Sequence, residues 1–86
     1  MDTEIQNIIN QDFDIEVREA VMLELLSLEL KHVMAESEHN LRNARMAILY
    51  LAKGSLSIVK EMTHFAKIDF RDVILWASEE RKKNSL

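Results

Sequence analysis

The stretch AILYLAKGSLSIVKEMTHFAKIDFRDVILWA, residues 47–77, decides the fold class. It contains the only glycine of the chain, Gly54, directly after a segment with helical apolar periodicity. Glycine in this place is a common signal for the end of a helix, because it adopts the left-handed conformation without strain. The stretch therefore predicts one helix over residues 41–53 and another that begins at Ser55 or Ser57.

The helix after Gly54 has one apolar and one polar face and ends near Ala66. Asp69 then stands where the N-cap of a last helix belongs, with Asp72 three residues later, as in a capping box with Asp in place of Glu. Four apolar residues share the face that this last helix is expected to bury: Phe70, Val73, Ile74 and Ala77. Arg71 and Asp72 lie on its outside and are the candidate recognition pair.

Composition extends the helical prediction to the whole chain. Its 86 residues include one glycine, no proline and no cysteine. Glycine-rich phosphate loops, dinucleotide folds and nucleophile elbows are therefore excluded, and no enzyme activity is expected. The fold predicted is all-α: a compact bundle of about four helices in a single domain over residues 1–86. Within it, residues 41–82 form a compact C-terminal unit. Residues 1–13 are weakly patterned: Ile5, Ile8 and Ile9 predict a short turn of helix that packs loosely, and a loosely ordered segment is the alternative.

A long first helix over residues 15–37, with Asp14 as its N-cap, carries two apolar stripes on nearly opposite sides. A surface helix needs only one apolar face, so the second stripe predicts a partner. The first stripe is the candidate homodimer interface and consists of Val17, Val21, Leu25 and Leu28. The second contains Met22, Leu23, Leu26, Leu30, Val33 and Met34. The polar segment ESEHN, residues 36–40, is expected to break the helix with Asn40 as a new cap, although a continuous helix is the alternative.

The C-terminal half, roughly residues 43–78, resembles a small uncharacterised bacterial helical family. The resemblance rests on Ala47, Leu49, Leu51, Gly54, Leu56, Ala66, Lys67, Asp69, Phe70, Arg71, Asp72 and Ala77. That family more often has Gly-Asp where this chain has Gly54-Ser55, and Asp-Trp where it has Asp69-Phe70. The resemblance implies a bacterial origin and a compact helical unit, and it implies no reaction.

Every histidine follows a glutamate by three residues. The pairs are Glu29 with His32, Glu36 with His39, and Glu61 with His64. On a helix this spacing places carboxylate and imidazole on adjacent turns, and ferritin-like bundles use such pairs to hold two metal ions. His32, Glu36 and His39 would also form a ladder on one helix face. The alternative is that these are ordinary surface pairs in a glutamate-rich chain, and no cofactor is expected.

Charge bears on possible partners. The net charge of −4 opposes nonspecific binding to nucleic acid, which depends on cations that neutralise phosphates. A DNA-binding alternative uses the helices on either side of Lys67 and Ile68 as a helix-turn-helix, with Arg81, Lys82 and Lys83 on phosphates. No apolar run reaches the roughly 20 residues of a membrane span, and the N-terminal residues lack the pattern of a signal peptide, so a cytoplasmic location is expected.

These observations predict a function without naming a reaction. We expect a small protein-interaction or regulatory module that forms a homodimer and binds an unidentified protein. The metal-binding bundle and the helix-turn-helix regulator are the alternatives.

Overall fold

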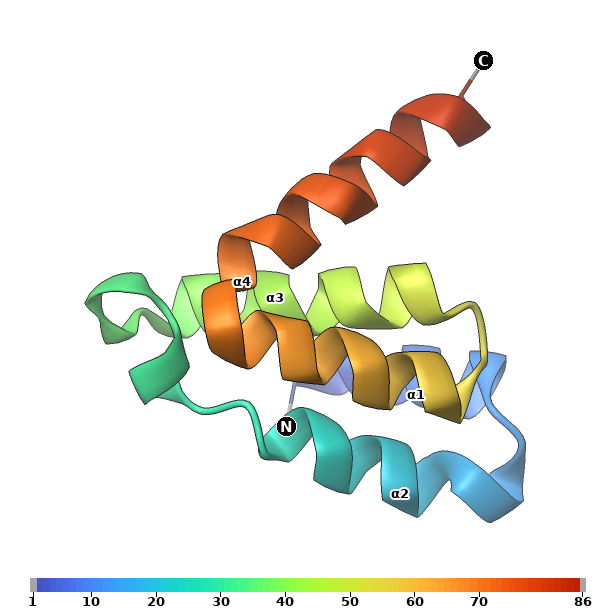
Figure 1. Cartoon of the computed structure of the whole chain (residues 1–86). Coiled ribbons are helices and arrows are strands. Elements are labelled where there is room, and N and C mark those ends of the chain that lie inside the picture. The colour runs from blue at the N-terminus through green and yellow to red at the C-terminus, as the bar shows by residue number, and fades with distance from the viewer. Residues whose placement is uncertain (1, 86) are drawn as a thin grey trace.

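The computed structural model describes residues 2–85 and confirms the all-α bundle (Figure 1). Within this range the chain forms four α-helices and no strand. The helices are α1 (Thr3–Asp12), α2 (Ile15–Leu26), α3 (Glu38–Ala52) and α4 (Leu56–Asn84). Two short 3₁₀ turns, Leu30–His32 and Met34–Glu36, lie in the connection between α2 and α3.

Helix α1 belongs to the core. The sequence leaves the order of residues 1–13 open, and the part that the structure describes forms a helix with buried residues. Asp2 caps the helix, its carboxylate accepting from the backbone N–H groups of Glu4 and Ile5 at 2.8 and 3.3 Å. Ile5, Ile9 and Phe13 are buried. Three large apolar side chains at helical spacing hold a helix of only three turns, because each buried one contributes about 1.5–3 kcal/mol. Met1 lies outside the described residues.

Helix α2 ends eleven residues earlier than predicted, at Leu26 rather than residue 37. The Ser27 hydroxyl donates to the Glu24 carbonyl at 2.6 Å, a local bond that competes with continued helix. The chain then turns, with Ala35 and Glu36 at positive φ (59° and 46°). Leu28 and Val33 are buried in this connection, so their apolar spacing serves a folded loop rather than a helix.

Helix α3 begins at Glu38, three residues before the predicted start. Ser37, not Asn40, is the N-cap: its hydroxyl accepts from the backbone N–H of Asn40 at 3.2 Å. The Asn40 side chain instead donates to the Met34 carbonyl at 3.2 Å and fixes the preceding turn. Six residues of α3 are buried, three of them alanine: Leu41, Ala44, Ala47, Ile48, Leu49 and Ala52. This helix is therefore the centre of the bundle.

The predicted end of α3 is confirmed. Lys53 and Gly54 both have left-handed backbone conformations, with φ of 48° and 85°. A Cβ atom at Gly54 would lie 2.6 Å from the carbonyl oxygen of Asp12. The turn between α3 and α4 therefore packs against the end of α1 and leaves no room for a side chain.

Helix α4 contains both predicted C-terminal helices. Ser55 caps it, accepting from the backbone N–H of Ile58 at 3.4 Å. The helix bends at Asp69, whose extended backbone (φ −155°, ψ 102°) separates a first arm, residues 56–68, from a second arm, residues 70–84. Figure 1 shows the two arms diverging from the bend, and the second arm also contacts α3, since Glu80 pairs with Lys53 and Arg81 lies over Tyr50.

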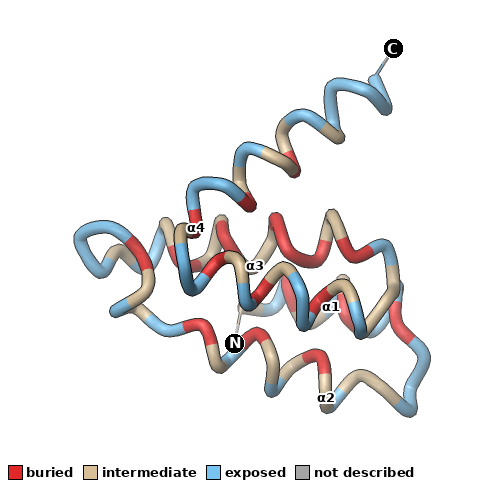
Figure 2. The backbone as a smooth tube through the Cα atoms, viewed as in Figure 1, coloured by how far each residue is buried: buried red, intermediate tan, exposed pale blue. Residues whose placement is uncertain are grey.

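The core lies where α4 packs against α3 and α2 and where α1 packs against α2 and α3, and Figure 2 marks the buried residues along these helices. Two alanines of α4, Ala66 and Ala77, have no exposed surface, like Ala44 and Ala52 of α3. Small residues on facing helices permit close approach of their backbones. Within residues 2–85, no helix is both long and apolar enough to cross a membrane.

Candidate interaction surface

The stripe predicted as a homodimer interface lies inside the chain. Val21, Leu25 and Leu28 have 0% exposed surface, and Val17 is partly buried against the same core. The reason is that α1 and the first arm of α4 both pack against α2 and cover this stripe. These four residues have little or no surface to offer a second copy of the chain, so the prediction of their role is wrong. A homodimer stays a prediction, and it requires another surface.

The exposed apolar residues of α2 lie on its opposite side. Ile15, Leu23 and Leu26 are 75%, 61% and 45% exposed. At 3.6 residues per turn these three side chains fall within about 80° of the helix circumference. In Figure 1, α2 runs along one edge of the molecule, with no other helix beyond it. We call this surface the outer face of α2.

Two acidic residues share the outer face of α2. Glu16 and Glu19 are exposed and project from the same side of the helix as Leu23. Neither carboxylate makes an ion pair or a hydrogen bond with another side chain within residues 2–85. The outer face therefore combines exposed apolar side chains with uncompensated negative charge.

The acidity of this edge is part of a charge asymmetry along the chain. Residues 1–40 contain ten Asp and Glu against two Lys and Arg, and residues 41–86 contain five against nine. The first part thus carries a net charge of −8 and the second +4, which together give −4. The part of the chain that contains α1 and α2 is therefore strongly acidic, although the whole molecule is only moderately so.

Two arginines fix the ends of α2, and sequence patterns alone did not reveal either role. Arg18 donates to the carbonyls of Phe13 (2.9 Å) and Asn10 (2.8 Å) at the corner between α1 and α2. Arg45 of α3 donates to the carbonyls of Leu25 (3.1 Å) and Leu28 (2.8 Å) at the end of α2, where carbonyls lack the i+4 partner of a continuing helix. Burial lowers the pKa of the Arg45 guanidinium. Arg18 lies close to a helix end in the sequence, a signal too frequent to single it out, and Arg45 is 20 residues from Leu25 and gives no local signal.

The two residues of the candidate recognition pair at the bend of α4, Arg71 and Asp72, have different surroundings. Arg71 is bound to Asp69: Nε and Nη2 donate to the two carboxylate oxygens at 2.9 Å each, and the Arg71 backbone N–H donates to Oδ1 at 3.0 Å. The predicted cap at Asp69 is thus confirmed, and the hydrogen bond with Arg71 lowers the pKa of Asp69. The same bond raises the pKa of Arg71. Asp72 is exposed and makes no capping bond, so the predicted capping box is wrong.

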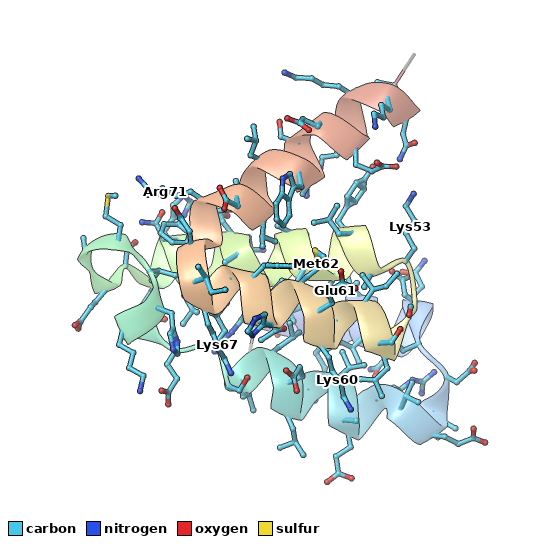
Figure 3. All side chains as sticks on the ribbon, viewed as in Figure 1. Lys53, Lys60, Glu61, Met62, Lys67 and Arg71 are labelled. Carbon is cyan, nitrogen blue, oxygen red and sulfur yellow. The ribbon has the colours of Figure 1, made fainter. Side chains whose placement is uncertain are left out.

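The glutamate–histidine pairs do not form the predicted ladder. His32 ends the first 3₁₀ turn, Glu36 ends the second, and His39 belongs to α3, so the three do not share a helix face. His32 Nδ1 accepts from the backbone N–H of Glu29 at 2.9 Å, and His39 Nε2 contacts Asn43 Nδ2 at 3.1 Å. Glu61 and His64 are exposed on the first arm of α4 (Figure 3 labels Glu61). Among residues 2–85, no three His, Asp or Glu side chains are grouped closely enough to hold a metal ion.

A surface cavity of about 310 Å³ lies between α1 and the start of α3. Its lining consists of Asp2, Ile5, Glu38, Leu41, Arg42 and Arg45. Arg42 Nε donates to Asp2 at 2.7 Å, and Arg42 also pairs with Glu4. This pairing lowers the pKa of Asp2 and raises that of Arg42. Of the charged groups of the cavity, Asp2 and Arg42 thus bind one another and Arg45 binds backbone carbonyls.

The second arm of α4 contacts α3 through one cation, Arg81, and one anion, Glu80. Arg81 lies over the ring of Tyr50, 4.6 Å from its centroid, and Lys53 pairs with Glu80 at 3.0 Å. Lys82 and Lys83 are exposed. The helices proposed for a helix-turn-helix are two arms of one bent helix, and only Asp69 leaves the helical conformation between them.

Comparison of the chain with protein-family models, with curated proteins and with solved structures found no match.

Proposed function

We propose that this chain is a small protein-interaction module and that the outer face of α2 is its binding surface. The observation that carries the proposal is the exposure of Ile15, Leu23 and Leu26 on one side of one helix. Large apolar side chains gathered on a surface mark interaction sites more often than single exposed ones do. Burial of such residues against a partner is favourable, at roughly 25 cal/mol per Å² of apolar surface.

The rigid mounting of α2 supports the same proposal. Arg18 and Arg45 hold its two ends, and Val21 and Leu25 fasten its inner side to the core. A surface on a fixed helix loses little conformational entropy when it binds. We also propose a cytoplasmic site of action, which agrees with a chain that has no cysteine.

The test compares capture of proteins by tagged variants. Wild type, the double variant Leu23→Gln/Leu26→Gln and the control Leu75→Gln are immobilised and exposed to a lysate of the source cells. Leu75 is an equally large apolar residue, 54% exposed on the second arm of α4. We expect proteins that wild type and the control retain and that the double variant loses. Identical retention by all three would refute the assignment of binding to this face.

A further inference from the structure

The acidic residues of the outer face of α2 specify the chemistry of its partner. We propose that the partner segment is an amphipathic helix with an apolar stripe and basic flanking residues. This inference rests on the proposed function and adds the identity of the binding segment. Its basis is charge complementarity: Glu16 and Glu19 lie beside the exposed apolar side chains, and neither forms an ion pair with a cation of residues 2–85.

Helix stability accounts for only part of this acidity. Glu16 lies in the first turn of α2, where a carboxylate interacts favourably with the helix dipole. Glu19 lies in the second turn, beyond the reach of that effect, and within the same sector as Ile15 and Leu26. A glutamate among exposed apolar residues weakens association with a neutral apolar surface and strengthens association with a cationic one.

The same charges oppose a second copy of the chain on this face. A twofold contact between two α2 helices would bring together Glu16 and Glu19 of both copies, with no cation on either face. Like charges placed together across an interface are destabilising. The wider surroundings agree, because residues 1–40 carry a net charge of −8. A partner with basic residues gains from this field, both in encounter rate and in orientation.

The shape of the surface favours a helix as the bound element. Helix α2 has 12 residues and is therefore about 18 Å long. Its exposed apolar residues form a narrow straight stripe, which matches the i, i+3, i+4, i+7 pattern that a partner helix of about three turns presents. Lys or Arg at the edges of that pattern would lie next to Glu16 and Glu19.

Two synthetic probes test the charge preference directly. Both are fluorescein-labelled 18-residue helical peptides with the same leucine stripe, and their flanking residues are either all Lys or all Glu. Fluorescence anisotropy is measured with the full chain at 50 and 200 mM NaCl. We expect the Lys peptide to bind at least about tenfold more tightly than the Glu peptide, and to weaken with salt as screened charge pairs do.

Four variants assign the binding to the face. Leu23→Gln/Leu26→Gln should lose the Lys peptide, and Glu16→Gln/Glu19→Gln should weaken it and reduce its salt dependence. The matched controls on the second arm of α4 are Leu75→Gln and Glu79→Gln, and both should bind like wild type. Thermal unfolding of each variant confirms that the exposed substitutions leave the fold intact.

The outcomes separate this inference from the proposed function. Equal binding of both peptides, lost in the Leu23→Gln/Leu26→Gln variant, would overturn the charge preference and leave the binding face in place. Binding that this variant does not change would overturn both proposals. A solution mass of the peptide-free protein that rises with concentration, and does not rise in this variant, would assign the face to a second copy and overturn the basic partner.

Discussion

At the scale of single residues, Gly54 and Asp69 set the direction of the C-terminal half of the chain. Both are recognisable in the sequence, because one is the only glycine and the other precedes an apolar helix at capping distance. The residues that they contact are not recognisable in the sequence. Gly54 lies against the Asp12 carbonyl, and Asp69 binds the side chain of Arg71, whereas the sequence predicts a capping box with Asp72. Local signals predict where a backbone changes direction, but the contact that requires the change depends on the folded arrangement.

Substitution Gly54→Ala should destabilise the protein by about 1–3 kcal/mol, since it adds a Cβ to a residue with φ of 85° and brings it within 2.6 Å of the Asp12 oxygen. Chemical denaturation provides the measurement. Lys60→Ala, at an exposed helical position, is the control and should stay within about 0.5 kcal/mol of wild type. A Gly54→Ala variant as stable as wild type would show that the turn has room.

The Asp69–Arg71 pair predicts a pH dependence of stability. Because the hydrogen bond with Arg71 lowers the pKa of Asp69, the folded state favours the ionised carboxylate. Its contribution is present above the ordinary pKa of about 4 and is lost as pH falls through the lowered folded value. Wild type should therefore exceed Asp69→Asn in free energy of unfolding near neutral pH, and the difference should shrink below pH about 4.

Denaturation at a series of pH values tests this dependence. The control is Asp72→Asn, which alters an exposed carboxylate that makes no ion pair within residues 2–85. A difference between wild type and Asp69→Asn that stays constant down to pH about 2.5 would contradict the assigned role of the carboxylate.

At the scale of elements, apolar periodicity predicted that the helices exist, but it did not predict where they end. The spacing of Leu28, Leu30 and Val33 continues the pattern of α2, yet these residues pack from a loop. Periodicity records which side chains are apolar, and a loop that folds over the core uses the same side chains. The end of α2 is fixed by Arg45, which is 20 residues from Leu25 in sequence and therefore outside any local pattern.

The two stripes of α2 show the same limit for the candidate surface. Periodicity correctly separated the two sides, but it did not decide which side is buried. Which side of α2 is buried depends on α1. The apolar pattern of α1 is weak in the sequence, yet α1 is a packed helix in which Ile5 and Ile9 are buried. The acidic outer face was readable in the sequence only after the inner stripe had been assigned to the core.

Removal of the Arg45 side chain should loosen the end of α2. Arg45→Ala removes the donor of the Leu28 carbonyl and leaves the Leu25 carbonyl with the Leu28 backbone N–H alone. The loss of two charged hydrogen bonds should cost about 2–4 kcal/mol. Arg42→Ala, on the same helix, removes more exposed ion pairs and should cost less. Free energies of unfolding give the comparison, and an equal or smaller loss for Arg45→Ala would contradict its capping role.

At the scale of the whole molecule, the bundle has one side closed by packing and one edge left open. Helix α3 is surrounded by α1 and by the two arms of α4, whereas α2 is covered on its inner side alone (Figure 1). The negative charge is concentrated in the same part of the chain as this open edge. A small domain buries a modest share of its surface, so an apolar edge left exposed is costly unless it is used.

The orientation of α2 is the central claim, and the free energies of unfolding of Leu25→Ala and Leu23→Ala test it most directly. Leu25 is fully buried and Leu23 is 61% exposed, although they are two residues apart on one helix. We predict a loss of about 2–5 kcal/mol for Leu25→Ala and a change within about 0.5 kcal/mol for Leu23→Ala. Equal losses, or a larger loss for Leu23→Ala, would contradict both the packing of α2 and the surface assigned to it.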